Sequence, residues 1–147
     1  MNSPFTYRRV DTLPDLTGLI ELYKEVFELS NFILPPSAHI QSLLENPEIV
    51  FLAAYHEGRI VGGLTAYVLP SVYAEKHEMY LYDLAILTSH QRKGIGRQLL
   101  EELKNHARGL NVSEIYVQAD IVDDGALAFY RATGGIEEDV RHFGYKV

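Results

Sequence analysis

The sequence predicts a single domain of the α/β (α+β) class, built on a mixed, mostly antiparallel sheet with helices on both faces. An apolar strand, a glycine turn and an amphipathic helix follow one another from Glu78 to Leu110, and a further strand follows, which implies one parallel pair. Glu57-Gly58 separates two apolar strands and indicates an antiparallel hairpin. The length of 147 residues suits one core spanning residues 1–147.

The first half of the chain is predicted to hold a strand, two helices and the hairpin. Thr12 precedes Leu13-Pro14, which is typical of an N-cap followed by proline in the first helical turn. Pro35-Pro36 cannot continue a helix, and Ser37 is predicted to cap the next one. The elements are a strand at Phe5–Val10, a helix from Leu13 to about Leu29, a short helix after Ser37, and the hairpin strands Ile49–His56 and Arg59–Leu69.

The second half is predicted to alternate strands with helices. In its long helix, Ile95, Leu99 and Leu103 recur at the spacing that buries one face. Gly134-Gly135 ends the last helix, which Asp123 or Asp124 is predicted to cap. The elements are a strand at Glu78–Ile86, a helix at Ile95–Leu110, a strand at Glu114–Ala119, a helix at Ala126–Ala132 and a final strand at Val140–Val147.

Composition excludes several classes of function. There are no cysteines, which excludes disulfides, thiolate metal sites and a cysteine nucleophile. The six histidines show no metal-ligand spacing, so no metal is expected. A net charge of −7 argues against nucleic acid as a partner and permits a cationic one. No stretch suits a membrane span or a secretory signal, so we expect no membrane association and a cytoplasmic location.

The turn Gln91–Arg97 (QRKGIGR) is predicted to bind phosphate, because its glycines let backbone N–H groups approach a ligand at a helix N-terminus. A Walker loop is excluded, since Gly96 is followed by arginine rather than Lys-Ser/Thr. The dinucleotide-binding fingerprint G-x-G-x-x-G is not matched, because Leu99 occupies its third glycine position. No strand ending in an acidic residue follows at the expected distance either. The remaining pattern is Q-x-x-G-x-G between a strand and a helix.

This pattern resembles the acetyl-coenzyme A loop of the GNAT N-acetyltransferase superfamily. A second signature of that superfamily is matched by Ala128-Phe129-Tyr130 followed by Gly134-Gly135-Ile136. The resemblance covers nearly the whole chain and is closest to the type I aminoglycoside 3-N-acetyltransferases, to which it is ungapped from about Gly62 onward. The segments that carry this closer match are Tyr67–Pro70, Tyr80–Ala85 and Tyr116–Asp120.

The resemblance implies acetyl-coenzyme A as cosubstrate. Backbone N–H groups from Arg92 to Gly96 would hold its pyrophosphate, and the preceding strand would pair with its pantetheine arm. The basic side chains of the turn also fit a solvated surface turn. The expected coenzyme-binding residues are Leu84, Ala85, Ile86, Gln91, Arg92, Lys93, Gly94, Ile95, Gly96 and Arg97.

Acetyl transfer to an amine requires a neutral nucleophile. With a reference pKa near 10.4, only about one amine in two thousand is neutral at pH 7, so a carboxylate base is needed. Asp83 lies between apolar residues of a strand, where a carboxylate is costly unless it is paired or used. The resemblance makes Asp83 the preferred base, and the alternative is a buried aspartate satisfied by backbone N–H groups.

Further residues are candidates for the acceptor site and for protonation of the thiolate. The resemblance implies that Tyr130 lies near the coenzyme sulfur as hydrogen-bond donor or general acid; the alternative is a core aromatic. Acidic residues after the second parallel strand should lie at the sheet edge where open sheets bind ligands, although one of them could instead cap a helix. The expected substrate-binding residues are Glu78, Tyr82, Asp120, Asp123 and Asp124.

The favoured function is direct acetyl transfer from acetyl-coenzyme A to an aminoglycoside, at the 3-amino group by resemblance. The first alternative is another cationic amine, such as a polyamine, a small metabolite or a peptide, because the loop Asn31–Pro36 is apolar where an aminosugar site would need polar residues. The second is a non-catalytic acetyl-coenzyme A-binding regulator. Dimers are common among relatives of this kind, so a homodimer is an expectation.

Overall fold

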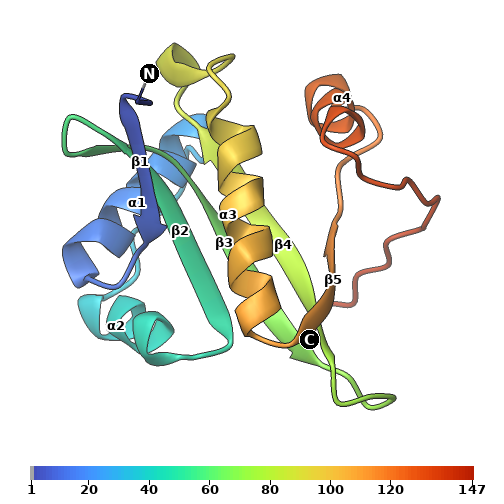
Figure 1. Cartoon of the computed structure of the whole chain (residues 1–147). Coiled ribbons are helices and arrows are strands. Elements are labelled where there is room, and N and C mark those ends of the chain that lie inside the picture. The colour runs from blue at the N-terminus through green and yellow to red at the C-terminus, as the bar shows by residue number, and fades with distance from the viewer. Residues whose placement is uncertain (1) are drawn as a thin grey trace. The chain divides into compact units, whose positions relative to one another are not determined.

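The computed structural model describes residues 2–147 and divides into two compact units (Figure 1). The first unit runs to Val117, and the second comprises Gln118–Val147. The elements are β1 (Phe5–Arg9), α1 (Leu13–Val26), α2 (Ser37–Glu45), β2 (Ile49–His56), β3 (Arg59–Pro70), β4 (His77–Ile86), the 3-10 turn η1 (Thr88–His90), α3 (Ile95–Gly109), β5 (Val112–Val117) and α4 (Asp124–Ala132).

The first unit contains a five-stranded sheet in the order β1-β2-β3-β4-β5. The first three pairings are antiparallel and β4 pairs with β5 in parallel, which confirms the predicted mixed, mostly antiparallel sheet. The predicted hairpin is also confirmed. Glu57 and Gly58 both have positive φ, at 50° and 79°, as a tight turn between right-twisted strands requires.

Helices cover both faces of this sheet, as two adjacent glycines of β3 demonstrate. A Cβ atom on Gly62 would lie 3.3 Å from Ile95 of α3, whereas one on Gly63 would lie 2.4 Å from Leu19 of α1. Neighbouring residues of a strand point to opposite faces, so α1 and α3 lie on opposite sides (Figure 1). Ile40 brings α2 into the same core as α1.

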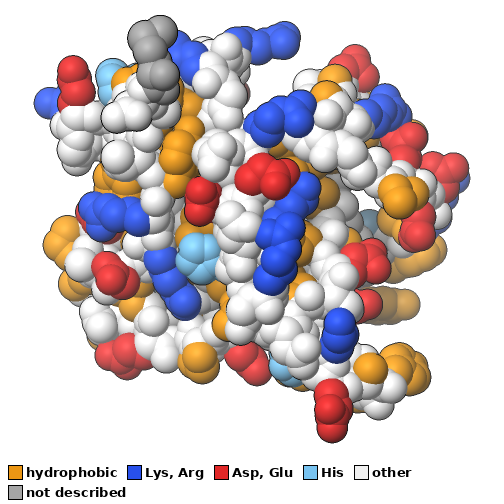
Figure 2. All heavy atoms as spheres, in the orientation of Figure 1, with side chains coloured by type: hydrophobic (Ala, Val, Ile, Leu, Met, Phe, Trp, Pro, Cys, Tyr) orange, Lys and Arg blue, Asp and Glu red, His pale blue; other side chains and the backbone are white. Residues whose placement is uncertain are grey.

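The helix α3 is amphipathic in the way its sequence predicts. Ile95, Leu99, Leu103 and Ala107 are buried against the sheet. Its outward face is solvated, and Figure 2 shows side chains of both charges interspersed over it. One such pair joins Lys104 to Glu101 at 2.8 Å. No helix within residues 2–147 combines the length and apolar character needed to cross a bilayer.

Two predictions about the first helices are wrong in detail. The helix α1 ends at Val26 rather than near Leu29, because Glu28 adopts φ of 53°, a left-handed conformation that interrupts a helix. Ser37 does not cap α2: it is the first helical residue, and Pro36 occupies the cap position without a side-chain hydrogen bond. The predicted cap at Thr12 is confirmed, since its hydroxyl accepts from the Asp15 amide at 3.3 Å.

The second unit contains one regular element, α4, among its residues 118–147. The predicted last strand at Val140–Val147 is wrong, because this segment is not assigned to any strand. A strand is stabilised by hydrogen bonds to a neighbouring strand, and this segment has no partner in the sheet. Its alternating apolar side chains, Phe143 and Tyr145, are largely exposed.

Candidate active site

The glycine turn is fixed by one side chain and two left-handed residues. Gln91 Nε2 donates to the Ile86 carbonyl at 3.1 Å and so connects the turn to the end of β4. Arg92 and Gly94 have φ of 62° and 81°. A Cβ atom on Gly94 would meet no other atom within 4 Å, so glycine is required there by backbone conformation rather than by crowding within the protein.

The N-terminus of α3 follows directly and is suited to an anion. No side chain caps the helix, and its first turn contains no acidic residue that would neutralise the helix dipole. Arg92, Lys93 and Arg97 are exposed around it, whereas the Ile95 side chain is buried, so only the backbone of Ile95 can face a ligand. A hollow of ≈ 440 Å³ lies beside the turn, lined by Ser3, Phe5, Tyr7, Lys93, Gly94 and Gln98.

The strand β4 changes its pairing before it reaches the turn. Its parallel pairing with β5 ends at Leu81, which lies opposite Val117. The residues from Asp83 to Ile86 keep their antiparallel partners in β3 but have no partner in β5. Within the first unit, the backbone edge that contains Leu84, Ala85 and Ile86 can therefore offer main-chain hydrogen bonds to an extended ligand.

A β-bulge places Asp83 where these pairings diverge. Thr65 lies opposite Asp83 and Ala66 lies opposite Leu81, so Tyr82 is the extra residue of β4. Asp83 is half-buried, and its carboxylate interacts with the Thr65 hydroxyl. Burial raises the pKa of Asp83 above its usual value, and the hydrogen bond from Thr65 opposes that rise.

Tyrosines surround this carboxylate. Tyr67 on β3 and Tyr80 on β4 both contact Tyr82 edge to face, at 5.5 and 5.4 Å between ring centroids. Tyr80 also stacks on Tyr116 of β5 at 4.8 Å. The Tyr82 side chain is 61% exposed, so the row presents an aromatic surface to solvent next to Asp83.

Sequence reasoning missed the two hydroxyl groups behind Asp83. Thr65 is 3% exposed, and its Oγ1 lies 2.8 Å from the hydroxyl of Tyr23 on α1. Tyr23 follows the buried leucines of α1 at helical spacing, and such a position predicts only a core residue. A lone threonine in the otherwise apolar strand β3 was the available signal, because a buried hydroxyl requires a hydrogen-bonding partner.

Glu78 lies away from the bulge. It is exposed near the start of β4 and five residues from Asp83, a separation of roughly 17 Å along a strand. Side-chain alternation places it on the face that also bears Tyr80 and Tyr82. The structure therefore groups Asp83 with the tyrosines and leaves Glu78 at the far end of the same strand.

The three aspartates of the second unit differ in their local roles. Asp123 is the N-cap of α4, since its Oδ1 accepts from the Ala126 amide at 3.0 Å. Asp120 accepts from the Val122 amide at 3.3 Å and shapes the preceding turn. Asp124 lies exposed in the first turn of α4. The sequence predicted that either Asp123 or Asp124 caps this helix, and the structure shows that Asp123 does.

Tyr130 lies on α4 and contacts Phe129 edge to face at 5.2 Å. Burial, together with the negative charge of Asp123, raises the pKa of Tyr130 to about 12. Its hydroxyl is therefore protonated at neutral pH. A hydroxyl whose pKa lies well above the reference value of about 8.5 for a thiol donates a hydrogen bond to a thiolate more readily than it gives up its proton.

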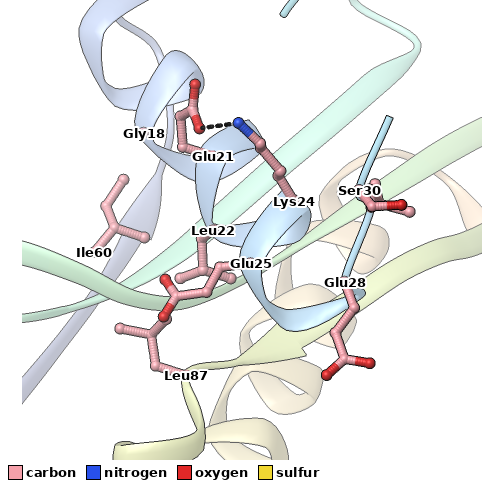
Figure 3. A pocket seen from close by; sticks show the side chains of 10 residues that line it. Gly18, Glu21, Leu22, Lys24, Glu25, Glu28, Ser30, Ile60 and Leu87 are labelled. Carbon is pink, nitrogen blue, oxygen red and sulfur yellow. Dashed lines mark ion pairs between the residues drawn. The ribbon is translucent and has the colours of Figure 1, made fainter. Parts of the chain in front are cut away.

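A groove larger than the hollow beside the turn lies elsewhere in the first unit, along α1 (Figure 3). It has a volume of ≈ 670 Å³ and an acidic rim of Glu21, Glu25 and Glu28, with Lys24 paired to Glu21 at 3.9 Å. Ile60 and Leu87 form part of its apolar floor. It contains none of the residues predicted for catalysis. Among residues 2–147 no cluster of three metal-ligating side chains is present.

The chain belongs to the Acetyltransferase (GNAT) family, which it matches over residues 16–134. It is 30% identical over 134 residues to an IAA acetyltransferase of Azospirillum brasilense, covering 88% of this chain and 82% of that protein. It is also 30% identical over 113 residues to the N-alpha-acetyltransferase RimI of Mycobacterium tuberculosis, covering 77% and 68%. The protein is therefore an acetyl-coenzyme A-dependent acetyltransferase.

The fold is also similar to that of meta-AAC0020, an aminoglycoside acetyltransferase from an uncultured soil metagenomic sample. Its complex with trehalose superposes with a TM-score of 0.94 at 43% identity, covering 97% of this chain and 96% of that one. Its complex with sisomicin gives the same TM-score at 42% identity. These similarities confirm the predicted fold class.

Proposed function

We propose that this enzyme transfers the acetyl group to an amino group of an aminoglycoside, with Asp83 as the base. The observation that carries the proposal is a half-buried carboxylate, at a strand bulge, beside a partly exposed row of tyrosines. Aromatic faces attract ammonium groups and pack against sugar rings, and the carboxylate adds charge complementarity. The likeness to meta-AAC0020, crystallised with sisomicin, supports the same class of acceptor.

The reaction begins with a protonated acceptor amine. Asp83 takes one proton from the ammonium, and the neutral nitrogen forms its bond to the acetyl carbon as the carbon–sulfur bond breaks. Acetyl-coenzyme A supplies the acetyl thioester. Tyr130 would donate a hydrogen bond to the departing sulfur, which acquires its proton as the second amine proton is lost. The raised pKa of Asp83 makes it a stronger base than a solvated carboxylate.

The coenzyme would be held by the turn and by the edge of β4. Three observations of the first unit fit this assignment. Gly94 is left-handed and has space around it, and the N-terminus of α3 has no side-chain cap. The pairing of β4 with β5 also ends at Leu81, which leaves the following backbone edge of β4 without a partner in β5. Backbone N–H groups from Arg92 to Gly96 would bind the pyrophosphate. The side chains of Gln91, Lys93 and Arg97 would surround it, and Leu84 to Ile86 would pair with the pantetheine arm.

Glu78, Tyr82, Asp120, Asp123 and Asp124 are proposed to contribute to acceptor binding. For Asp123 this role would be added to helix capping, because its carboxylate retains acceptor capacity. The resemblance to type I 3-N-acetyltransferases favours the 3-amino group of the acceptor. Acetylation there would remove one positive charge from the antibiotic and so serve resistance. Assembly as a homodimer and a cytoplasmic location stay predictions.

A peptide amine is the second candidate acceptor. It is favoured by the 30% identity to RimI, named as an N-alpha-acetyltransferase, and by the apolar loop Asn31–Pro36. A thiol-release assay with acetyl-coenzyme A and three acceptor panels separates the candidates: aminoglycosides, polyamines and N-terminal peptides. Preference for sisomicin over every peptide supports the proposal. Turnover confined to peptides would overturn it.

Gly94→Val should weaken acetyl-coenzyme A binding, measured by calorimetry, by at least about tenfold. Valine strongly disfavours φ of 81°, and its branched side chain would occupy the space proposed for the pyrophosphate. Gly134→Val is a matched control, because Gly134 also has positive φ, at 91°, and lies outside the turn. Unchanged affinity in a folded Gly94→Val protein would remove the turn from the coenzyme site.

Tyr130→Phe should lower kcat by about tenfold or more while leaving KM nearly unchanged, since it deletes one hydroxyl and keeps the ring. Steady-state kinetics with the best acceptor tests this. Phe129 provides a comparison, because Phe129→Leu removes the aromatic neighbour but no hydroxyl. Normal kcat together with a lower melting temperature for Tyr130→Phe would assign Tyr130 to packing instead.

A further inference from the structure

Two hydroxyl groups connect Asp83 to the interior of the first unit. Thr65 lies directly opposite Asp83 in the sheet, and the interaction of its hydroxyl with the carboxylate lowers the pKa of Asp83. The Thr65 Oγ1 atom lies 2.8 Å from the hydroxyl of Tyr23, which projects from α1 into the core. A line of polar groups therefore runs from the helix, through the sheet residue, to the carboxylate proposed as the base.

The chemistry of these groups fixes the direction of the hydrogen bonds. An ionised carboxylate can only accept, so a hydrogen bond between the two groups uses the single hydroxyl proton of Thr65. The remaining capacity of Thr65 Oγ1 is as an acceptor, and Tyr23 must then be the donor to it. The chain Tyr23 to Thr65 to Asp83 is thus fully satisfied when Asp83 carries its negative charge.

The burial of these hydroxyls indicates that they have a role beyond packing. Thr65 is 3% exposed and Tyr23 is 8% exposed. A valine and a phenylalanine would fill the same volumes without any desolvation of hydroxyl groups. The two hydroxyl groups, which satisfy each other, therefore give packing little advantage over those apolar side chains, whereas they can serve the group at the end of the chain.

Among the described residues of the first unit, the other groups that interact electrostatically with Asp83 carry no balancing positive charge. They are the phenols of Tyr23 on α1, Tyr67 on β3, and Tyr80 on β4 beside Tyr82. Burial raises the pKa of Tyr23, Tyr67 and Tyr80, so these phenols are neutral near pH 7. Hydrogen bonding from Thr65 is then the interaction that opposes the cost of burying the carboxylate.

We propose that Thr65 and Tyr23 are positioning residues that hold the Asp83 carboxylate ionised and in one orientation while it accepts the proton of the acceptor amine. The proposal rests on the function assigned to Asp83 above. Neither residue touches substrate in this scheme. Thr65 acts directly on the carboxylate, and Tyr23 acts by fixing the direction of the Thr65 hydroxyl.

The test uses Thr65→Val, which is nearly isosteric and removes the hydroxyl. Two titrations are measured on the whole protein: the acid limb of the kcat/KM profile and the carboxyl ¹³C shift of Asp83 by NMR. Loss of a hydrogen bond to a charged group should move both midpoints upward by about one to two pH units. Thr65→Ser should restore the midpoints, and Tyr23→Phe should shift them in the same direction by less.

Tyr55→Phe is the matched control for a buried tyrosine. The Tyr55 hydroxyl donates to Asp15 Oδ2 at 3.0 Å and is remote from the Thr65 hydrogen bonds. Its replacement should lower the melting temperature without moving either midpoint. If Thr65→Val does not fold, the two midpoints are compared between the native protein, Tyr23→Phe and Thr65→Ser.

The outcomes separate this inference from the proposed function. Unmoved NMR midpoints in folded Thr65→Val and Tyr23→Phe would overturn the inference and leave Asp83 as the base. An NMR midpoint that moves while the activity profile does not would overturn Asp83 as the base, and with it the catalytic role of both hydroxyls. Movement of both midpoints, with rescue by serine, supports the proposal.

Discussion

Asp83→Asn is expected to lower kcat/KM for the best amine acceptor by about 10²–10⁴-fold, the usual contribution of a general base. Asparagine has nearly the same shape and keeps an oxygen that can accept from Thr65. The substitution therefore removes the charge and proton affinity of the carboxylate with little change in packing. Thiol release measures the loss, and calorimetry should find acetyl-coenzyme A affinity unchanged.

The pH dependence distinguishes a base from a charge that only attracts the substrate. In the native enzyme kcat/KM should fall as pH drops through the raised pKa of Asp83, because the protonated carboxyl cannot accept a proton. In Asp83→Asn this limb should disappear, and alkaline pH should recover part of the activity. A loss seen mainly in KM and reduced by added salt would instead indicate simple attraction.

The same substitution should stabilise the fold at neutral pH. The folded-state pKa of Asp83 is raised above its unfolded value, so the free energy of unfolding falls as pH rises through the folded pKa. Asparagine does not ionise, so the variant does not lose free energy of unfolding in this way. The melting temperature of Asp83→Asn should thus exceed that of the native protein at pH 7, and the difference should shrink below about pH 4, where the carboxyl is neutral in both states.

Gly63→Ala is expected to lower the free energy of unfolding by about 3 kcal/mol. The added Cβ would lie 2.4 Å from Leu19 Cδ1 and 2.8 Å from the Leu52 carbonyl oxygen. The leucine side chain can rotate, but the carbonyl belongs to the neighbouring strand β2 and moves only if the sheet moves. Urea unfolding followed by circular dichroism measures the change.

Gly109→Ala is the control for this prediction. Gly109 is the last residue of α3, and a Cβ atom there would meet nothing within 4 Å. Alanine should stabilise the protein by up to about 1 kcal/mol, because it restricts the unfolded chain. Equal effects of Gly63→Ala and Gly109→Ala on unfolding would contradict the close approach of α1 to the sheet.

Local signals in the sequence predicted most of the fold. The cap at Thr12 and the turn at Glu57-Gly58 are confirmed because each depends on residues within a few positions of itself. The strand predicted at Val140–Val147 is wrong. Its alternating apolar and polar residues indicate only a local preference for extended backbone, and a strand also requires a neighbouring strand as partner. Pairing between distant segments is not visible in a pattern confined to one of them.

The site was predicted less completely than the fold. Asp83 stood out because a carboxylate within an apolar strand is costly. The bulge at Tyr82 could not be predicted, since it exists only in the register between β3 and β4. The partnership of Tyr23 with Thr65 joins positions 42 residues apart, and Tyr23 on its own is indistinguishable from a core aromatic.

The extra residue at Tyr82 also limits how this segment can vary between related enzymes. Tyr82 has no partner in β3, so the strand could lose this residue and keep its register, whereas loss of a paired residue such as Leu84 would shift its neighbours to the opposite face of the sheet. Ala85, which packs in the core beneath α1, and Asp83 would then exchange environments with their neighbours. Evolution and laboratory libraries can therefore exchange side chains between Tyr80 and Ile86, whereas insertions and deletions of paired residues there should be eliminated.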